Sequence, residues 1–84
     1  MTNDLRGPIR AFLAEIVEDW PADDVSDDAN LFARGLLDSL AVHEVVGFLE
    51  DEFGVVFEDA DLAVDKFASV DAMAAMVVEK RSSA

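Results

Sequence analysis

Hydrophobic residues recur at helical spacing in three stretches of the chain, and the first lies near its start. Its apolar positions are three or four residues apart, as on one face of an amphipathic helix: Leu5, Ile9, Phe12, Leu13, Ile16, Val17 and Trp20. Asn3 and Asp4 are candidate N-caps, and Pro8 fits a helix only in its first turn. We therefore predict a first helix that ends before Pro21.

A polar stretch separates this pattern from the next one. Between Trp20 and Leu37 apolar residues become sparse, and the residues that replace them include Asp23, Asp24, Asp27, Asp28 and Asn30. Such a composition predicts a long connection, with Gly35 supplying a turn. We expect the loop to be pinned to the core by Leu31, Phe32 and either Leu36 or Leu37.

The second helix is expected to begin within the motif GLLDSL, residues 35–40. Asp38 is a favoured N-cap type, which makes Ser39 the first helical residue, and Gly54 stands where a helix C-cap is expected. The inward stripe between them comprises Val42, Val45, Val46, Leu49 and Phe53. This is the clearest helix in the sequence.

The remainder of the chain contains a short turn and a last helix. The turn surrounds EDADL and begins at Glu58 or Asp59. Ser69 is the expected cap of the last helix, whose inward stripe is Val70, Met73, Ala74 and Val77 and whose C-terminal end carries Lys80 and Arg81. The predicted fold class is all-α, a single domain over residues 1–84: a small bundle of three main helices plus one short helix, with a long loop between the first two.

Charge narrows the range of partners. The chain has 19 acidic and 6 basic residues, for a formal net charge of −13. Eight acids and no Lys or Arg lie between Asp38 and Asp61 inclusive. This balance opposes binding to nucleic acids and to anionic membranes and favours encounter with basic protein patches, although an acidic surface also simply keeps a small protein dissolved. No apolar run is long enough to span a bilayer and MTNDLRGPIR lacks the apolar core of a signal peptide, so we expect a cytoplasmic protein.

Several kinds of chemistry can be tested against the residues and rejected. The absence of cysteine excludes disulfides, thiolate metal sites and cysteine nucleophiles. An EF-hand loop starting at Asp59 would place Ala63, Val64 and Val70 where a ligand, a glycine and a glutamate are needed. A serine hydrolase built on Ser39 would have only His43 as a base, with no orienting partner and no GxSxG elbow. We therefore expect no enzyme and no metal site.

A serine at a helix N-terminus has two other interpretations. Ser39 is expected to lie at the positive end of a helix dipole, where a phosphate attached to its hydroxyl would be favoured. The alternative is that Ser39 merely belongs to the capping sequence, and position alone favours that simpler explanation.

The segment from Leu31 to Val77 resembles the body of an acyl carrier protein, whose hallmark is an Asp-Ser-Leu that opens the second helix after a long loop. The similarity covers about the whole chain, although the first helix matches only in its pattern. The positions that carry it are Phe32, Gly35, Asp38–Leu40, the EFG at the end of the second helix, Phe57 and the FASV before the last helix.

This resemblance implies that Ser39 is the acceptor of a 4′-phosphopantetheine arm, attached by a phosphopantetheinyl transferase that uses coenzyme A. The arm would bring the thiol that the chain lacks. The implied further partners are an acyl-loading ligase or acyltransferase and downstream synthases or modifying enzymes with basic patches, all visiting a monomeric carrier. The implied partner-binding surface on the second helix is Asp38, Leu40, His43, Glu44, Gly47, Glu50 and Asp51.

The sequence also departs from the pattern of general fatty-acid carriers. Ala41 stands where an acid is usual, and His43 and Gly47 replace apolar residues. The GLLDS form is more similar to discrete carriers of specialised pathways, such as those that handle polyketide intermediates, unusual extender units or aminoacyl groups. Asp38 before the serine favours an acyl over an aminoacyl or peptidyl carrier. The remaining alternative is an unmodified acidic helical module that docks on a basic partner.

Overall fold

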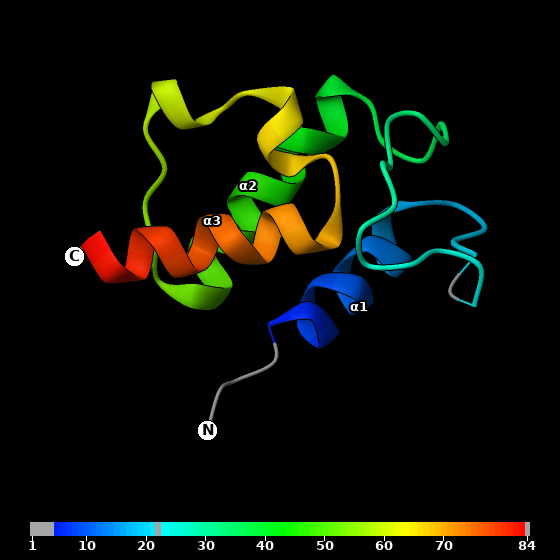
Figure 1. The fold of residues 1–84 in the computed structure, drawn as a ribbon, viewed down its shortest axis with the longest axis horizontal. Coiled ribbons are helices and arrows are strands. Elements are labelled where there is room, and N and C mark those ends of the chain that lie inside the picture. Colours follow the sequence, from blue (N-terminus) through cyan, green and yellow to red (C-terminus); the bar gives the residue numbers. More distant parts are fainter. Residues whose placement is uncertain (1–4, 22, 84) are drawn as a thin grey trace.

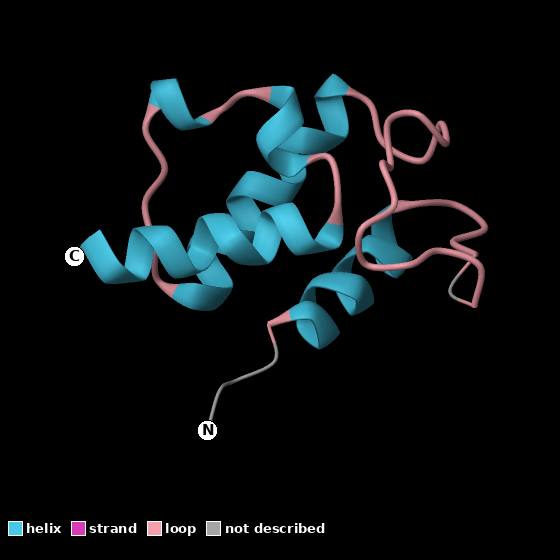
Figure 2. Cartoon of the chain, in the orientation of Figure 1, coloured by secondary structure: helices cyan, strands magenta, loops and turns pink. Residues whose placement is uncertain are grey.

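The computed structural model describes residues 5–21 and 23–83, with side chains up to residue 81. It contains three α-helices, α1 (Arg6–Ile16), α2 (Ser39–Phe53) and α3 (Val70–Ser83), and two short 3₁₀ helices, η1 (Asp59–Asp61) and η2 (Val64–Phe67). The described residues form no strand (Figure 2). The predicted all-α fold is thus confirmed, and η2 is an element that the sequence analysis did not predict.

The helices are arranged so that α1 contacts both α2 and α3, while η2 contacts α2 and α3 (Figure 1). The long loop between α1 and α2, cyan in Figure 1, lies at the end of the molecule opposite the C-terminus. The fully buried side chains come from every α-helix, the loop and η2: Ile9, Leu13, Leu31, Val45, Leu49, Phe67, Val70, Met73 and Val77. A single core therefore joins elements from the whole chain.

α1 ends earlier than its hydrophobic stripe suggested. Val17 is the C-cap in an extended conformation, and Asp19 has a φ of 58°, so the chain reverses before Pro21. Trp20 lies beyond the helix, and the Arg10 guanidinium is 5.8 Å from the centre of its ring. Asp19 tolerates this positive φ, and Pro21 disfavours helical geometry at Trp20, so the helix does not resume before Pro21. The predicted caps Asn3 and Asp4 lie outside the described residues.

The loop and the later caps agree with the sequence prediction. Leu31 and Leu37 are buried, and Phe32 and Leu36 pack against the core from partly exposed positions. Gly54 ends α2 with a φ of 68°, and the Ser69 hydroxyl accepts a hydrogen bond from the Ala72 N–H at 3.0 Å. These positions could be predicted from the sequence because each depends on local chain geometry.

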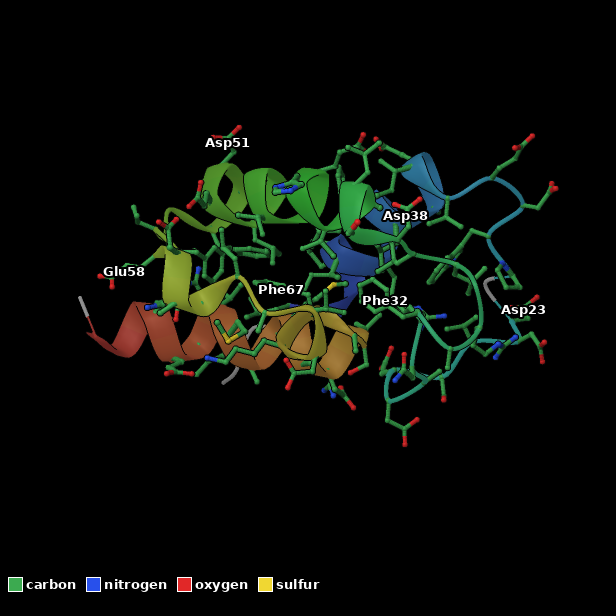
Figure 3. All side chains as sticks on the ribbon, turned by 90° about the horizontal axis from the view of Figure 1, so that it is seen from above. Asp23, Phe32, Asp38, Asp51, Glu58 and Phe67 are labelled. Atoms are coloured by element: carbon green, nitrogen blue, oxygen red, sulfur yellow. The ribbon has the colours of Figure 1, made fainter. Side chains whose placement is uncertain are left out.

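The Phe67 ring, which belongs to η2, fills the space between α2 and α3. Phe67 is fully buried and lies between α2 and α3 (Figure 3), where its ring meets Phe57 edge-on with 5.6 Å between centroids. Phe53, by contrast, is only half-buried although it ends the inward stripe of α2. The Arg81 guanidinium lies 5.6 Å from the centre of the Phe53 ring.

An ion pair fastens η1 to α3. The Lys80 ammonium donates to the Asp61 carboxylate at 2.6 Å, and the same carboxylate accepts the Glu58 N–H at 2.8 Å. The Lys80 hydrogen bond, followed by the Glu58 N–H, lowers the pKa of Asp61 from its usual 3.8. Asp61 in turn raises the pKa of Lys80 above 10.5, mainly through the same hydrogen bond.

Phe67→Ala should lower the free energy of unfolding by about 3–5 kcal/mol, because the substitution leaves a cavity between packed helices. Phe53→Ala should have a smaller effect because its ring is already half in contact with solvent. Urea unfolding followed by circular dichroism measures both. Equal losses from the two variants would contradict the packing described here.

The Asp61–Lys80 pair should make stability depend on pH at both extremes. Because the pKa of Asp61 is lowered on folding, its contribution is present above pH 3.8 and is lost as the pH falls through the folded value. The Lys80 contribution is present below pH 10.5 and is lost as the pH rises through the raised value. The stability difference between wild type and Asp61→Asn should therefore be full at neutral pH and shrink in acid. Asp59→Asn, at an exposed neighbouring carboxylate, is the control, and a difference that persists unchanged in acid would contradict the assignment.

Candidate functional site

The start of α2 is positioned by a tight turn in the preceding loop. The buried Leu31 carbonyl accepts hydrogen bonds from the N–H groups of Leu36, at 2.8 Å, and Leu37, at 3.3 Å. Gly35 completes this turn with a φ of 73°, a value that glycine adopts without strain. The buried Leu37 then anchors the chain one residue before it emerges at Asp38.

Asp38 caps α2 as predicted. Its backbone is extended, with φ −130° and ψ 179°, and its carboxylate accepts the Ala41 N–H at 2.8 Å. Its carbonyl accepts the Val42 N–H at 3.2 Å, which starts the helical hydrogen-bond ladder. A cap of this type typically contributes about 0.5–2 kcal/mol, so the first turn of α2 is firmly defined.

Ser39 is the first residue of α2 and is exposed. Its side chain therefore lies at the helix end where N–H groups point outward and the dipole favours a negative group. Its hydroxyl makes no hydrogen bond to any other described residue. Ser39 is thus open to modification on both steric and electrostatic grounds.

The other serines with described side chains are differently engaged. The Ser26 hydroxyl donates to the Asp28 carboxylate at 2.7 Å. Ser69 is half-buried and its hydroxyl oxygen caps α3. A group attached to Ser69 would replace a structural hydrogen bond, whereas a group on Ser39 would replace none within the described residues. This contrast separates Ser39 from Ser26 and Ser69.

A groove of about 290 Å³ lies beside the start of α2. The end of α1, the turn before α2 and the first turn of α2 line it: Ile16, Val17, Glu18, Gly35, Leu36, Leu37, Asp38 and Ala41. The lining includes Asp38 and Ala41, the residues directly before and after Ser39 and Leu40. A group attached to Ser39 would therefore start beside the groove.

The predicted partner-binding residues separate into two groups. Most are exposed on α2, and the structure brings them together along one helix: Asp38, Leu40, His43, Glu44, Gly47 and Asp51. Figure 3 shows Asp38 and Asp51 near its opposite ends. Leu40, the apolar member of the group, is 70% exposed.

Glu50 differs from this group because it is half-buried and its carboxylate accepts the Phe57 N–H at 2.9 Å. It therefore ties the chain after α2 back to the helix. The sequence analysis missed this role because the contact follows a change of chain direction that periodicity does not encode.

The acids of α2 have no neutralising counterpart in the described part of the chain. Arg6 and Arg10 pair with Asp27, Arg6 also with Asp71, Arg34 with Asp24, and Lys80 with Asp61. None of these ion pairs involves an acid of α2, so the helix presents uncompensated negative charge.

Two other features, a metal-binding cluster and a membrane-spanning helix, are absent from residues 5–21 and 23–83. No group of three or more His, Asp or Glu residues there could hold a metal ion. No helix in the same ranges has the length and apolar character to cross a bilayer.

The geometry agrees with a comparison against known families. A family model described as "Phosphopantetheine attachment site" matches residues 8–77, which span most of α1, all of α2, both 3₁₀ helices and more than half of α3. A search of curated proteins found no match. Members of the matched family carry a covalent 4′-phosphopantetheine group and are not themselves catalysts. The chain therefore belongs to the phosphopantetheine-binding carrier proteins, the family of the acyl carrier proteins.

Proposed function

We propose that the chain is a discrete acyl carrier protein in which Ser39 bears the 4′-phosphopantetheine arm and that it serves a specialised pathway. One observation carries the choice of Ser39: its exposed hydroxyl, unengaged by any described residue, stands at the first position of a capped helix. The arm supplies the thiol on which carriers hold acyl groups as thioesters. The chain itself has no cysteine that could compete for them.

Attachment requires a separate transferase, because no described side chain is placed to deprotonate Ser39. The Ser39 oxygen forms a bond to the phosphorus next to pantetheine in coenzyme A, and the diphosphate linkage breaks. The nucleotide portion leaves, and the hydroxyl proton passes to a base of the transferase. Asp38 keeps its carboxylate on the Ala41 N–H, which holds Ser39 at the helix tip.

Partners are expected to find this site through the charge of α2. Uncompensated acids steer association with basic patches, and complexes of this kind form rapidly and weaken with salt. Short-lived binding suits a carrier that must visit a transferase, a loading ligase or acyltransferase, and later synthases or modifying enzymes.

The nature of the cargo is inferred from the positions in α2 that depart from the pattern of general fatty-acid carriers, and from Asp38. Ala41 stands where general fatty-acid carriers usually have an acid, and His43 and Gly47 replace apolar residues, which supports a dedicated set of partners. Asp38 before the serine supports an acyl over an aminoacyl cargo. The competing proposal is an unmodified docking module, which the acidic face of α2 would serve equally well.

Incubation with coenzyme A and a broad-specificity phosphopantetheinyl transferase should raise the intact mass of the wild-type protein by one phosphopantetheine. Ser39→Ala should remain unchanged, and Ser69→Ala, if folded, should gain the same mass as wild type. Mass spectrometry of the intact proteins gives the answer. An unmodified wild type would favour the docking module, and a modified Ser39→Ala would place the arm elsewhere.

Reversing charge on the exposed face of α2 should slow loading without unfolding the protein. Glu44→Lys with Asp51→Lys should lower kcat/KM for the transferase by roughly tenfold at low salt, and the deficit should narrow at high salt. Asp23→Lys with Asp59→Lys makes the same change in net charge at exposed positions outside α2 and outside η2, the short helix that contacts α2. Equal effects from the two pairs would show that only net charge matters. Glu50 is left intact because its carboxylate holds the Phe57 N–H.

A further inference from the structure

A second surface feature lies between α1 and α2, away from Ser39. An open groove of about 440 Å³ is lined on the α1 side by Pro8, Ala11, Phe12 and Glu15 and on the α2 side by Phe48 and Glu52. The spacing of these positions places the first set on one face of α1 and the second on one face of α2. The two faces meet because α1 and α2 are in contact.

The floor of this groove is a pair of aromatic rings. Phe12 and Phe48 stack with 4.2 Å between centroids and 9° between ring planes, and both remain half-buried. Phe53 meets Phe48 edge-on at 6.2 Å and supports it from the side. Ala11 is exposed, and its small side chain leaves the rings accessible. The result is an apolar surface that the fold leaves partly exposed.

The rim of the groove is acidic. Glu15 and Glu52 are both exposed, and no ion pair within the described residues involves either of them. A carboxylate on each helix therefore flanks the aromatic floor on its two sides. An occupant that matches both features presents an apolar side chain with cationic groups beside it.

We propose that this groove, defined by Ala11, Phe12, Glu15, Phe48 and Glu52, is a docking site for a partner-protein segment that inserts one apolar side chain between two basic residues. The proposal rests on the proposed carrier function, because it adds an anchoring point for the enzymes that a carrier visits. It assigns α1 a direct part in recognition, beside the acidic face of α2.

Other occupants fit the charges less well. A net charge of −13 opposes nucleic acids and anionic membranes. A second copy of this chain would bring the same negative charge, and most of its cations are already engaged: Arg6, Arg10, Arg34 and Lys80 in ion pairs and Arg81 over Phe53. The cationic group must therefore come from a different protein.

The test uses a synthetic helical peptide with a central leucine and one arginine a helical turn to each side, titrated into the isotope-labelled apo protein and followed by NMR. Two single substitutions on α1 make the same change in charge: Ala11→Arg fills the groove, and Ala14→Arg lies at an exposed position outside its lining. Because Ala11 and Ala14 are both exposed, neither substitution should disturb the core, and a loss of binding would not reflect unfolding.

We expect the largest amide shifts at Ala11, Phe12, Phe48 and Glu52. Ala11→Arg should weaken binding at least tenfold more than Ala14→Arg, a factor consistent with burial of one leucine-sized side chain. Replacing the peptide leucine by serine should weaken binding to wild type and to Ala14→Arg, with little further effect on Ala11→Arg. Equal losses from the two protein variants, or shifts centred on Leu40 and Glu44, would overturn the proposal.

The outcome is separable from that of the carrier proposal. Peptide binding needs no arm, so it can be measured on Ser39→Ala as well as on wild type. Groove binding by a protein that is never modified on Ser39 would overturn only the carrier function. Modification of Ser39 with equal effects of Ala11→Arg and Ala14→Arg would overturn only the groove.

Discussion

The position of Ser39 depends on how the buried Leu31 holds the loop before α2. Its side chain fills the core, its N–H donates to the Ala68 carbonyl at 2.7 Å, and its carbonyl accepts two N–H groups from the turn that follows. These contacts link the loop to the start of α3 and fix the point at which the chain leaves the core. Asp38 then begins α2 at a defined place, and Ser39 follows at its exposed tip. A residue with no polar side chain thus determines where the Ser39 hydroxyl lies.

Ion pairs connect α1 to the loop and to α3, whereas the acids of α2 form no ion pair within the described residues. Arg6 and Arg10 of α1 join the loop at Asp27, and Arg6 also reaches Asp71 at the start of α3. Each such surface pair contributes little to stability alone, and none of them involves an acid of α2. The acids of α2 and the rim of the α1–α2 groove keep their negative potential as a result. The loop is thus joined to α1 by ion pairs, whereas the acids of α2 form none within the described residues.

Local features of the fold could be predicted from the sequence, whereas features that depend on long-range contacts could not. The limits of α2, its caps at Asp38 and Gly54, and the Ser69 cap follow from residues that act on their immediate neighbours. The end of α1, the Phe67 contact across η2 and the Glu50 bond to Phe57 depend on chain reversals and long-range packing, which hydrophobic periodicity does not record. For the site, the sequence placed Ser39 at a helix start and Ser69 at a helix cap, but only the structure showed that the Ser26 hydroxyl is engaged as well. The α1–α2 groove was likewise invisible, because Phe12 and Phe48 appear in separate helices with no signal that they stack.

The central claim is that this chain functions in its cell as a carrier with its arm on Ser39. The most direct measurement is peptide mapping by mass spectrometry of the protein isolated from its own cells while its pathway is active. The account predicts phosphopantetheine, bare or acylated, on the peptide that contains Asp38, Ser39 and Leu40, and on no other peptide. A Ser39 that is unmodified throughout the native pool would contradict it.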